Sequence, residues 1–351
     1  MNPDDIDPQL LRYSRQILFD GIGVEGQRRL RSARAVLVGC GAIGSVQADV
    51  LVRAGVGALR ICDRDFVERD NLQRQMLFDE EDATADLPKA EAAARRLRRI
   101  NSDVCIEAVA CDVNHANIEQ LADGFDLLLD GTDNFETRFL LNDLSVKTNR
   151  PWVYGAVVGS GGLSMAVAPG RTPCLRCLFP EAPPPDVSPT CDTAGVIAPA
   201  VHLVGALQAM EALKILTGRT DHLHGRLVEV DLWTGRFAAI DVSRAKQKDC
   251  PCCGRRSFPF LSGERASSTT TLCGRNAVQV RPAGAAGTLD FDRIAERLAA
   301  VASGPLTRNP FLLRVTIEGR EIVLFRDGRA IIRGTEDERE ARSFYAKYVG
   351  A

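Results

Sequence analysis

A glycine-rich turn is the first feature of the sequence that could bind a ligand. Gly39, Gly41 and Gly44 follow a short apolar run and open a pattern typical of a helix. In such a turn the backbone N–H groups and the helix N-terminus can face phosphate oxygens. Asp63 ends the next apolar run, where a carboxylate can accept hydrogen bonds from ribose hydroxyls. Together these features indicate a nucleotide site, but they do not distinguish NAD from ATP.

Charged side chains further along the chain favour a triphosphate. Arg74 and Lys89 can neutralise charge that grows on phosphate oxygens, and Asp133 can hold a Mg²⁺ ion that bridges them. Hydride transfer to a nicotinamide needs no such set. A single basic residue is more often an exposed surface charge, so the prediction of ATP depends on the whole set.

Two pairs of cysteines predict a metal site. Cys174 and Cys177 form one C-x-x-C turn, and Cys250 and Cys253 form a second one far along the chain. Paired turns of this kind build closed tetrahedral four-cysteine Zn²⁺ sites, which leave no position for a reacting water. The sequence therefore predicts a structural zinc ion. Cys252 is then the spare thiol, and it is also the alternative to Cys253 as fourth ligand.

One further cysteine is a candidate for chemistry. Cys191 lies in a loop before the long apolar stretch 195–218, and a helix N-terminus there would make a thiol more reactive. The alternative is a small, partly buried side chain without a reaction. Polar residues interrupt the apolar stretch at helical spacing, which predicts a buried helix rather than a membrane span.

Strands and helices alternate through the first part of the chain, and these elements must position the residues above. Predicted strands are short apolar runs, at 34–40, 59–63, 105–109 and 125–130. Predicted helices lie between them, at 43–54, 88–100 and 134–149. The alternation predicts a Rossmann-like, doubly wound, mostly parallel α/β sheet. Strands at 152–158 and 163–168 and a hairpin at 227–242 are expected to extend it in antiparallel fashion.

The chain is predicted to have three parts. Residues 1–256 form the nucleotide-binding domain with the cysteine pairs, and residues 257–271, rich in Ser, Thr and Gly, form a linker. Residues 272–351 form a small α+β unit with a hairpin turn at Asp327-Gly328 and a last helix that starts at a capping box, Thr335 to Glu338. The sequence assigns no chemistry to this unit.

Composition excludes several classes of partner. The 351 residues are 45% hydrophobic and 26% charged, with a formal net charge of -2. No excess of positive charge favours binding to nucleic acid or to an anionic membrane. The N-terminal stretch MNPDDIDPQL has acidic residues and prolines where a secretory signal has a basic start and an apolar run. We therefore expect a cytoplasmic protein, with neither nucleic acid nor a membrane as partner.

Many of these motifs occur together in one known family. They are Arg12-Tyr-Ser-Arg15-Gln, the glycine turn, Asp63 with Asn71-Leu-Gln-Arg74-Gln, Lys89, Thr132-Asp133-Asn134 and the two cysteine pairs. In this order and spacing, from about Leu11 to Gly254, the chain resembles the MoeB/ThiF/HesA family of the ubiquitin-activating-enzyme superfamily. The number of independent motifs makes the resemblance highly specific.

The resemblance implies a role for each residue of the nucleotide site. Asp63 would bind the ribose of ATP, and Asp133 would coordinate Mg²⁺. The phosphates would be held by the glycine turn and by Asn71, Arg74 and Lys89.

The resemblance also implies a reaction and partners. The C-terminal Gly-Gly carboxylate of a small ubiquitin-like sulfur-carrier protein would attack the α-phosphate of ATP in line, releasing pyrophosphate and leaving an acyl adenylate. Sulfur transfer for thiamine, molybdopterin or a related product would follow. Cys191 matches a cysteine that links covalently to the carrier in some family members, and a separate sulfurtransferase is a candidate partner. Arg15 would reach the triphosphate of the neighbouring subunit, which implies a homodimer with composite sites.

Other functions agree with part of the sequence. An NAD-dependent oxidoreductase would share the glycine turn but would leave the basic residues and Asp133 without a purpose. A catalytically silent scaffold would need no phosphate or magnesium ligands. Relatives within the superfamily activate a peptide carboxylate, a carbonyl carried on tRNA or a conjugating ubiquitin-like protein. A rhodanese domain, present in some relatives, is disfavoured because the C-terminal unit is short and Cys273 is its only cysteine.

Overall fold

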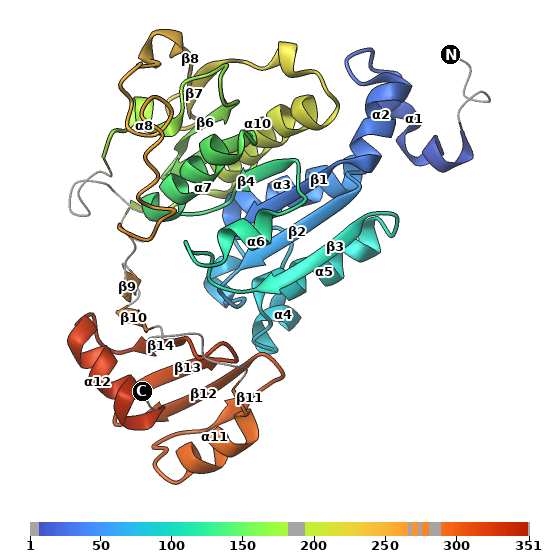
Figure 1. Cartoon of the computed structure of the whole chain (residues 1–351). Helices are drawn as coiled ribbons and strands as arrows, with labels where there is room; N and C mark the ends of the chain where they lie inside the picture. The colour runs from blue at the N-terminus through green and yellow to red at the C-terminus, as the bar shows by residue number, and fades with distance from the viewer. Residues whose placement is uncertain (1–6, 182–193, 266–268, 273–275, 281–288, 350–351) are drawn as a thin grey trace. The chain divides into compact units, whose positions relative to one another are not determined.

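An eight-stranded sheet forms the centre of the first of two units into which the chain divides, Met1–Ala266 and Ser267–Ala351. The computed structural model describes residues 7–181, 194–265, 269–272, 276–280 and 289–349. The order of the first sheet is β3-β2-β1-β4-β5-β6-β7-β8 (Figure 1). Its strands are β1 (Arg34–Val38), β2 (Ala58–Asp63), β3 (Cys105–Ala110), β4 (Leu127–Asp130), β5 (Trp152–Val158), β6 (Gly161–Val167), β7 (Arg226–Asp231) and β8 (Arg236–Asp241).

Strand pairing confirms the predicted fold class. The first five strands pair in parallel, and β6, β7 and β8 extend the sheet in antiparallel fashion. The described α-helices of this unit are α1 (Ser14–Ile17), α2 (Gly23–Ser32), α3 (Ala42–Ala54), α4 (Glu80–Thr84), α5 (Lys89–Ile100), α6 (Ile118–Ala122), α7 (Phe135–Thr148), α8 (Leu175–Leu178) and α10 (Ala198–Leu216). The sheet and its helices form a doubly wound, mostly parallel α/β domain.

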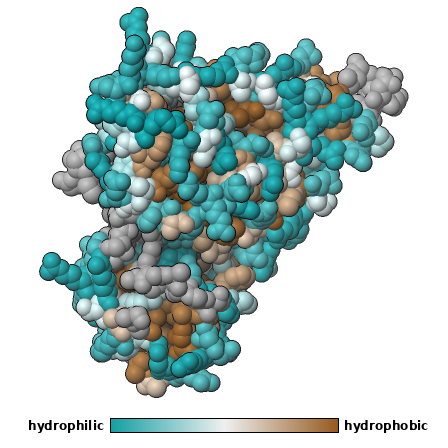
Figure 2. Space-filling model, viewed as in Figure 1, coloured by the Kyte–Doolittle hydropathy of each residue, from teal (hydrophilic) through white to brown (hydrophobic). Residues whose placement is uncertain are grey.

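Helices cover both faces of this sheet, which explains why its central strands are continuously apolar (Figure 1). Leu37 of β1 packs in a core with α3, α5 and α10, whereas Val36 and Val38 pack on the other face in a core with α6 and α7. Hydrophilic side chains cover most of the face of the molecule seen in Figure 2. Within the part of the chain that the structure describes, no helix has the length and hydrophobicity needed to cross a membrane.

Two helix ends show why the chain turns where it does. Asn134 accepts a hydrogen bond from the Thr137 N–H at 2.9 Å and so caps α7. Gly55 ends α3 with φ of 86°, and a Cβ there would lie 2.4 Å from the Tyr13 ring. Only glycine satisfies both conditions, so the N-terminal segment can pack closely against the end of α3.

The first unit extends beyond the boundary expected at residue 256. Phe258, Phe260 and Leu261 pack against the core that contains α7, and the Phe260 N–H donates to the Asp143 carboxylate at 3.0 Å. The Phe260 ring also stacks on Phe139, with ring centroids 4.9 Å apart. Residues 258–261, which we expected to be linker, are therefore part of the first unit.

The second unit is a small α+β fold, as predicted. Its six-stranded sheet has the order β11-β12-β13-β14-β10-β9, and all pairs are antiparallel. The strands are β9 (Thr269–Leu272), β10 (Ala277–Val280), β11 (Thr307–Arg308), β12 (Leu312–Ile317), β13 (Arg320–Phe325) and β14 (Ala330–Arg333). Helices α11 (Phe291–Ala299) and α12 (Glu338–Tyr348) share one core with it. The cap of α12 is Asp337 rather than Thr335, because Asp337 accepts from the Arg339 and Glu340 N–H groups.

Candidate nucleotide site and metal centre

The carboxyl ends of three neighbouring strands meet at one edge of the first sheet. Val38 of β1 is level with Cys62 of β2 on one side and with Asp130 of β4 on the other. The chain leaves β1 toward β2 and later returns to β4 on the opposite side of β1. In open α/β sheets ligands bind at such a switch in strand order, outside the carboxyl ends of the strands.

The glycine turn lies at this switch point, between β1 and α3. Gly39 has φ of 85°, and a Cβ on Gly44 would lie 2.2 Å from the Gly39 carbonyl oxygen. These two glycines let α3 approach the turn backbone to backbone. At Gly41 the nearest atom to an added Cβ is Nε2 of Gln75, at 3.9 Å. The space beside Gly41 and the N-terminus of α3 can therefore accept phosphate oxygens.

The loop that follows β4 contacts the glycine turn directly. The Gly131 N–H donates to the Val38 carbonyl at 2.8 Å, and a Cβ on Gly131 would lie 2.0 Å from the Gly39 oxygen. Asp133 stands two residues further on and is exposed. Among the described residues, nothing hydrogen-bonds to its side chain. Its carboxylate is thus available to a cation close to the glycine turn.

Asp63 supports the glycine turn from the end of β2. Its Oδ2 accepts from the Cys40 N–H at 2.5 Å, and its Oδ1 accepts from the Asp65 N–H at 2.7 Å. Only 7% of the residue is exposed. Burial raises the pKa of the Asp63 carboxyl, and the nearby Lys89 charge acts against that rise. Each oxygen keeps a lone pair that a ribose hydroxyl could use.

Lys89 is a buried cation rather than a solvated surface charge. It is the first residue of α5, and its side chain is only 4% exposed. Nζ lies 3.2 Å from Oδ2 of Asp65, and the Lys89 N–H donates to the Asp65 carbonyl at 2.9 Å. A buried ammonium group near the glycine turn suits the binding of a negatively charged ligand.

Asn71 and Arg74 belong to one short turn after β2. Asn71 is fully buried at the end of a 3-10 helix, Arg69–Asn71, and its Oδ1 accepts from the Glu68 N–H at 3.3 Å. Arg74 is half-buried, and its Nη1 donates to the Asp70 carbonyl at 2.6 Å. Gln75 of the same turn is the residue beside Gly41. The turn therefore borders the glycine turn.

Arg15 lies at the other end of α3. Its neighbour Gln16 donates to the Ala54 carbonyl at 3.0 Å, and Tyr13 packs against Gly55. Because α3 is about 20 Å long, these contacts hold Arg15 far along the helix from the glycine turn of its own chain. Arg15 is also exposed. The structure therefore brings together the other described residues predicted for the nucleotide site, but not Arg15.

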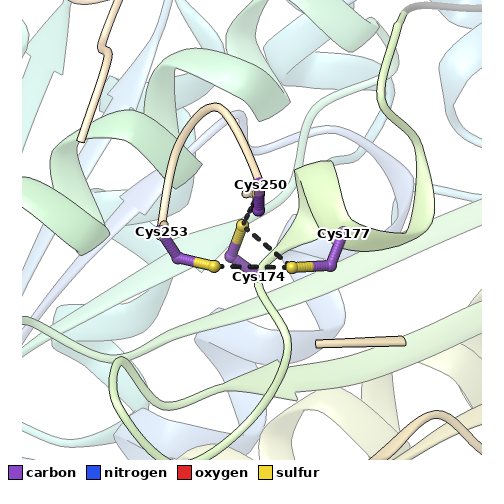
Figure 3. A group of neighbouring side chains, drawn as sticks. All are labelled: Cys174, Cys177, Cys250 and Cys253. Atoms are coloured by element: carbon purple, nitrogen blue, oxygen red, sulfur yellow. Dashed lines mark hydrogen bonds between the residues drawn. The ribbon is translucent and has the colours of Figure 1, made fainter. Parts of the chain in front are cut away.

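Four cysteines converge where the two C-x-x-C turns meet, as Figure 3 shows. The Sγ atom of Cys174 lies 3.9 Å from the Sγ atom of Cys177 and 3.7 Å from that of Cys250. The Sγ atoms of Cys177 and Cys253 are 3.4 Å apart. All four lie within 4.8 Å of one another. A tetrahedron with Zn–S bonds of about 2.3 Å has S···S edges of about 3.8 Å. The cluster has the donor type and the size for a closed metal site.

Cys252 lies beside the cluster of four, where it interacts with Cys174 and with Asn142. Its Sγ accepts from Nδ2 of Asn142 at 3.2 Å, and Oδ1 of the same asparagine accepts from the Leu175 N–H at 2.8 Å. Asn142 thus joins both cysteine turns to α7, which begins next to Asp133. Of the two alternatives for the fourth member of the cluster, the structure places Cys253 there.

Cys191 lies outside the described residues. The described residues resume at Ala194, and Val196 pairs with Gly159 in an isolated β-bridge. Gln73, in the turn of Asn71 and Arg74, donates to the Val196 carbonyl at 3.5 Å. The segment that follows Cys191 therefore contacts the turn that carries candidate phosphate-binding residues.

A buried ion pair beside this site is absent from the sequence prediction. Asp130 at the end of β4 and Arg138 of α7 approach within 3.2 Å. Burial raises the pKa of the Asp130 carboxyl, and the Arg138 charge and hydrogen bonds from Thr132 and Gly155 act against that rise. The signal that could have revealed the pair is an acidic residue at the end of an otherwise apolar strand, followed by an arginine early in the next helix.

Comparison with known proteins extends these observations. The model of the ThiF family matches residues 13–252. The chain is 46% identical over 339 residues to the sulfur carrier protein ThiS adenylyltransferase of Bacillus subtilis, covering 97% of this chain and 99% of that protein. It is 42% identical over 246 residues to the SAMP-activating enzyme E1 of Haloferax volcanii, covering 70% and 89%. The first of these relatives also aligns with the C-terminal unit, which the family model does not reach.

A solved structure supports the fold independently of close sequence identity. Escherichia coli MccB with ATP superposes with a TM-score of 0.60 at 23% identity, covering 69% of this chain and 74% of that one. At that identity the likeness shows the fold alone. The family model and the two relatives are stronger evidence for the family of this chain. The family model matches most of the first unit, and the relatives align with 97% and 70% of the chain. The chain belongs to the ThiF family.

Proposed function

We propose that the chain is a cytoplasmic adenylyltransferase that uses ATP to activate the C-terminal Gly-Gly carboxylate of a ubiquitin-like sulfur-carrier protein. The observation that carries this proposal is the contact between the glycine turn and the Asp133 loop at the strand-order switch. This contact supports a site in which the glycine turn holds phosphate and the exposed Asp133 carboxylate lies beside it. Lys89 and Arg74 add positive charge at the same edge of the sheet. Hydride transfer to NAD would use neither the carboxylate nor the two cations.

In this proposal the residues bind and orient the reactants. The backbone around Gly41, with Asn71, Arg74 and Lys89, holds the triphosphate, and Asp63 holds the ribose. Bound at Asp133, Mg²⁺ would neutralise charge on the phosphates. The carrier carboxylate then attacks the α-phosphate in line, and pyrophosphate leaves. The reaction requires no side chain to exchange a proton, so positioning and charge neutralisation account for the rate.

The test is pyrophosphate exchange into ATP, measured with a panel of carriers that end in Gly-Gly. We expect exchange with at least one carrier, largest for a ThiS-type carrier, because a relative that aligns with 97% of the chain is named for ThiS. Removing the last glycine of that carrier should abolish the signal. Exchange driven by a peptide or by tRNA would instead support another member of the superfamily. NADH formation without exchange would contradict the proposal.

The position of Arg15 supports a homodimer with shared sites. Arg15 is exposed, and so are three apolar side chains close to it in the chain, Leu11, Leu18 and Phe19, the last of them 61% exposed. Exposed apolar side chains around a cation that lies away from its own glycine turn suit the surface of a second subunit. We propose that Arg15 contacts the triphosphate bound by its neighbour.

The cysteine cluster supports a zinc ion with a structural role. Cys174, Cys177, Cys250 and Cys253 supply four thiolates at the spacing of a tetrahedral Zn²⁺ site. Zn²⁺ held in this way has no open position for substrate. It would join α8 and the 250–254 segment to α7 through Asn142.

Cys191 is proposed to form the covalent link with the activated carrier, with sulfur supplied by a separate sulfurtransferase. The thiolate would attack the acyl adenylate and displace AMP. The variant Cys191→Ala should retain wild-type pyrophosphate exchange, since adenylation precedes this step. Thiocarboxylate formation on the carrier, followed by mass spectrometry, should fall at least about tenfold. A normal rate of thiocarboxylate formation would contradict the covalent role.

A further inference from the structure

The buried ion pair of Asp130 and Arg138 has no part in the chemistry proposed above. Asp130 is fully buried and Arg138 is 5% exposed. A buried ion pair adds little stability compared with apolar side chains of similar size, because both charges lose their hydration. The role of the pair is therefore better inferred from the groups to which its two side chains are hydrogen-bonded.

The pair binds every polar group of Thr132, the residue before Asp133. The Thr132 N–H donates to Oδ1 of Asp130 at 2.9 Å, and its hydroxyl donates to the same oxygen at 2.7 Å. The Thr132 carbonyl accepts from Nη2 of Arg138 at 2.8 Å. The backbone entering Asp133 is thus fixed from both sides by charge-assisted hydrogen bonds.

The same pair is tied to three other elements. Oδ2 of Asp130 accepts from the Gly155 N–H of β5 at 3.3 Å, and Arg138 donates to the Gly155 carbonyl at 3.1 Å. The Asp130 carbonyl accepts from Gln47 of α3 at 2.8 Å and from Gln208 of α10 at 2.9 Å. Because α3 also starts at the glycine turn, the network connects the two halves of the site.

We propose that Asp130 and Arg138 are positioning residues that fix the Asp133 carboxylate for the divalent cation of a metal–ATP complex. The inference rests on the proposed function, in which Asp133 is the metal ligand. Residues that orient a metal ligand typically change metal affinity or activity 10- to 100-fold when replaced. Loss of the pair should therefore weaken metal binding while the metal ligand itself is still present.

Two variants test the pair. Arg138→Lys keeps the positive charge, but an ammonium group lacks the planar fork that contacts Asp130 and the two carbonyls together. Thr132→Val keeps the shape of Thr132 and removes only the hydroxyl donor, and Thr132→Ser restores it. Arg53→Lys is the matched control, since Arg53 pairs with Asp49 at 2.8 Å at the far end of α3.

The measurement is Mn²⁺ affinity in the presence of ATP, followed by electron paramagnetic resonance without any carrier. Arg138→Lys should weaken Mn²⁺ binding by about 10- to 100-fold. Thr132→Val should weaken it less, and Thr132→Ser and Arg53→Lys should match wild type. Binding of ATP without metal should stay unchanged in every variant. In pyrophosphate exchange, Arg138→Lys should raise the Mg²⁺ concentration for half-maximal rate.

Unchanged Mn²⁺ affinity in folded Arg138→Lys would overturn the inference, as would an equal loss of metal-free ATP binding. Circular dichroism checks folding, and if Arg138→Lys does not fold, Thr132→Val decides between the same two outcomes. A wild-type protein that binds Mn²⁺ and ATP but exchanges with no carrier would contradict the proposed reaction only. The two failures are therefore distinguishable.

Discussion

Replacement of Asp133 by alanine is expected to lower carrier-dependent pyrophosphate exchange about a thousandfold or more. The side chain is exposed and makes no hydrogen bond within the described residues, so its removal should leave stability nearly unchanged. What is lost is the carboxylate that would hold Mg²⁺ against the phosphates. Thermal melting should show a folded protein. Asp123→Ala, at an exposed aspartate after α6, is the matched control and should exchange at the wild-type rate. Undiminished exchange by Asp133→Ala would refute the assignment of Asp133.

Mixed dimers test the proposed homodimer and its shared sites. Arg15→Ala should also abolish exchange, if Arg15 serves the site of its neighbour. When the two inactive variants are unfolded and refolded together, about half of the dimers should be mixed, and each should contain one intact site of two. Activity should therefore return to about a quarter of the wild-type value. No recovery, from dimers shown to be mixed, would place Arg15 in the site of its own chain.

If the four-cysteine cluster binds zinc as proposed, removal of the metal should lower the melting temperature by about 10 °C or more, because structural zinc contributes several kcal/mol to folding. The cluster joins residues that are far apart in the chain, and Asn142 passes that restraint to α7. Cys250→Ser should have the same effect as a strong chelator. Melting followed by circular dichroism, with metal content from mass spectrometry, measures both.

Cys105→Ser is the control for this experiment. Cys105 is exposed at the start of β3 and lies outside the cluster. The Cys105→Ser variant should retain stoichiometric zinc and the wild-type melting temperature. A wild-type protein that is free of zinc and melts at the same temperature with and without added zinc would contradict a structural metal.

Backbone requirements explain which parts of the site were predictable. Gly39 and Gly44 stand where backbone segments are in contact and a Cβ atom would clash. This requirement for glycine can be recognised directly in the sequence. The cysteine pairs are visible for a similar reason, because each C-x-x-C turn is local. The ion pair of Asp130 and Arg138 joins a strand end to the next helix, and its mark in the sequence is weaker: an acidic residue that ends an apolar strand, and an arginine early in the following helix. Ordinary charged residues also occur in such positions without pairing, so the pattern alone does not identify the contact.

The fold was predictable where local pattern and packing agree. The central strands are apolar on both faces because helices cover both faces of the sheet. Strand β6 begins at Gly161, two residues before the predicted start at 163, because Gly161 and Gly162 pair with β7 despite the low strand propensity of glycine. The linker was predicted to begin too early in the chain. The Ser- and Gly-rich composition of 257–271 favoured a linker, although Phe258 and Phe260 within it pack in the core.

The two hydrogen bonds of Asp63 limit how the nucleotide preference of this site could be redesigned. In many nucleotide-binding folds the acidic residue after the second strand is an obvious position to exchange in order to accept a different ribose. Here the carboxylate also holds the Cys40 and Asp65 N–H groups, one of them in the glycine turn itself. An engineered Asp63→Ser or Asp63→Ala would therefore disturb the glycine turn before it altered selectivity.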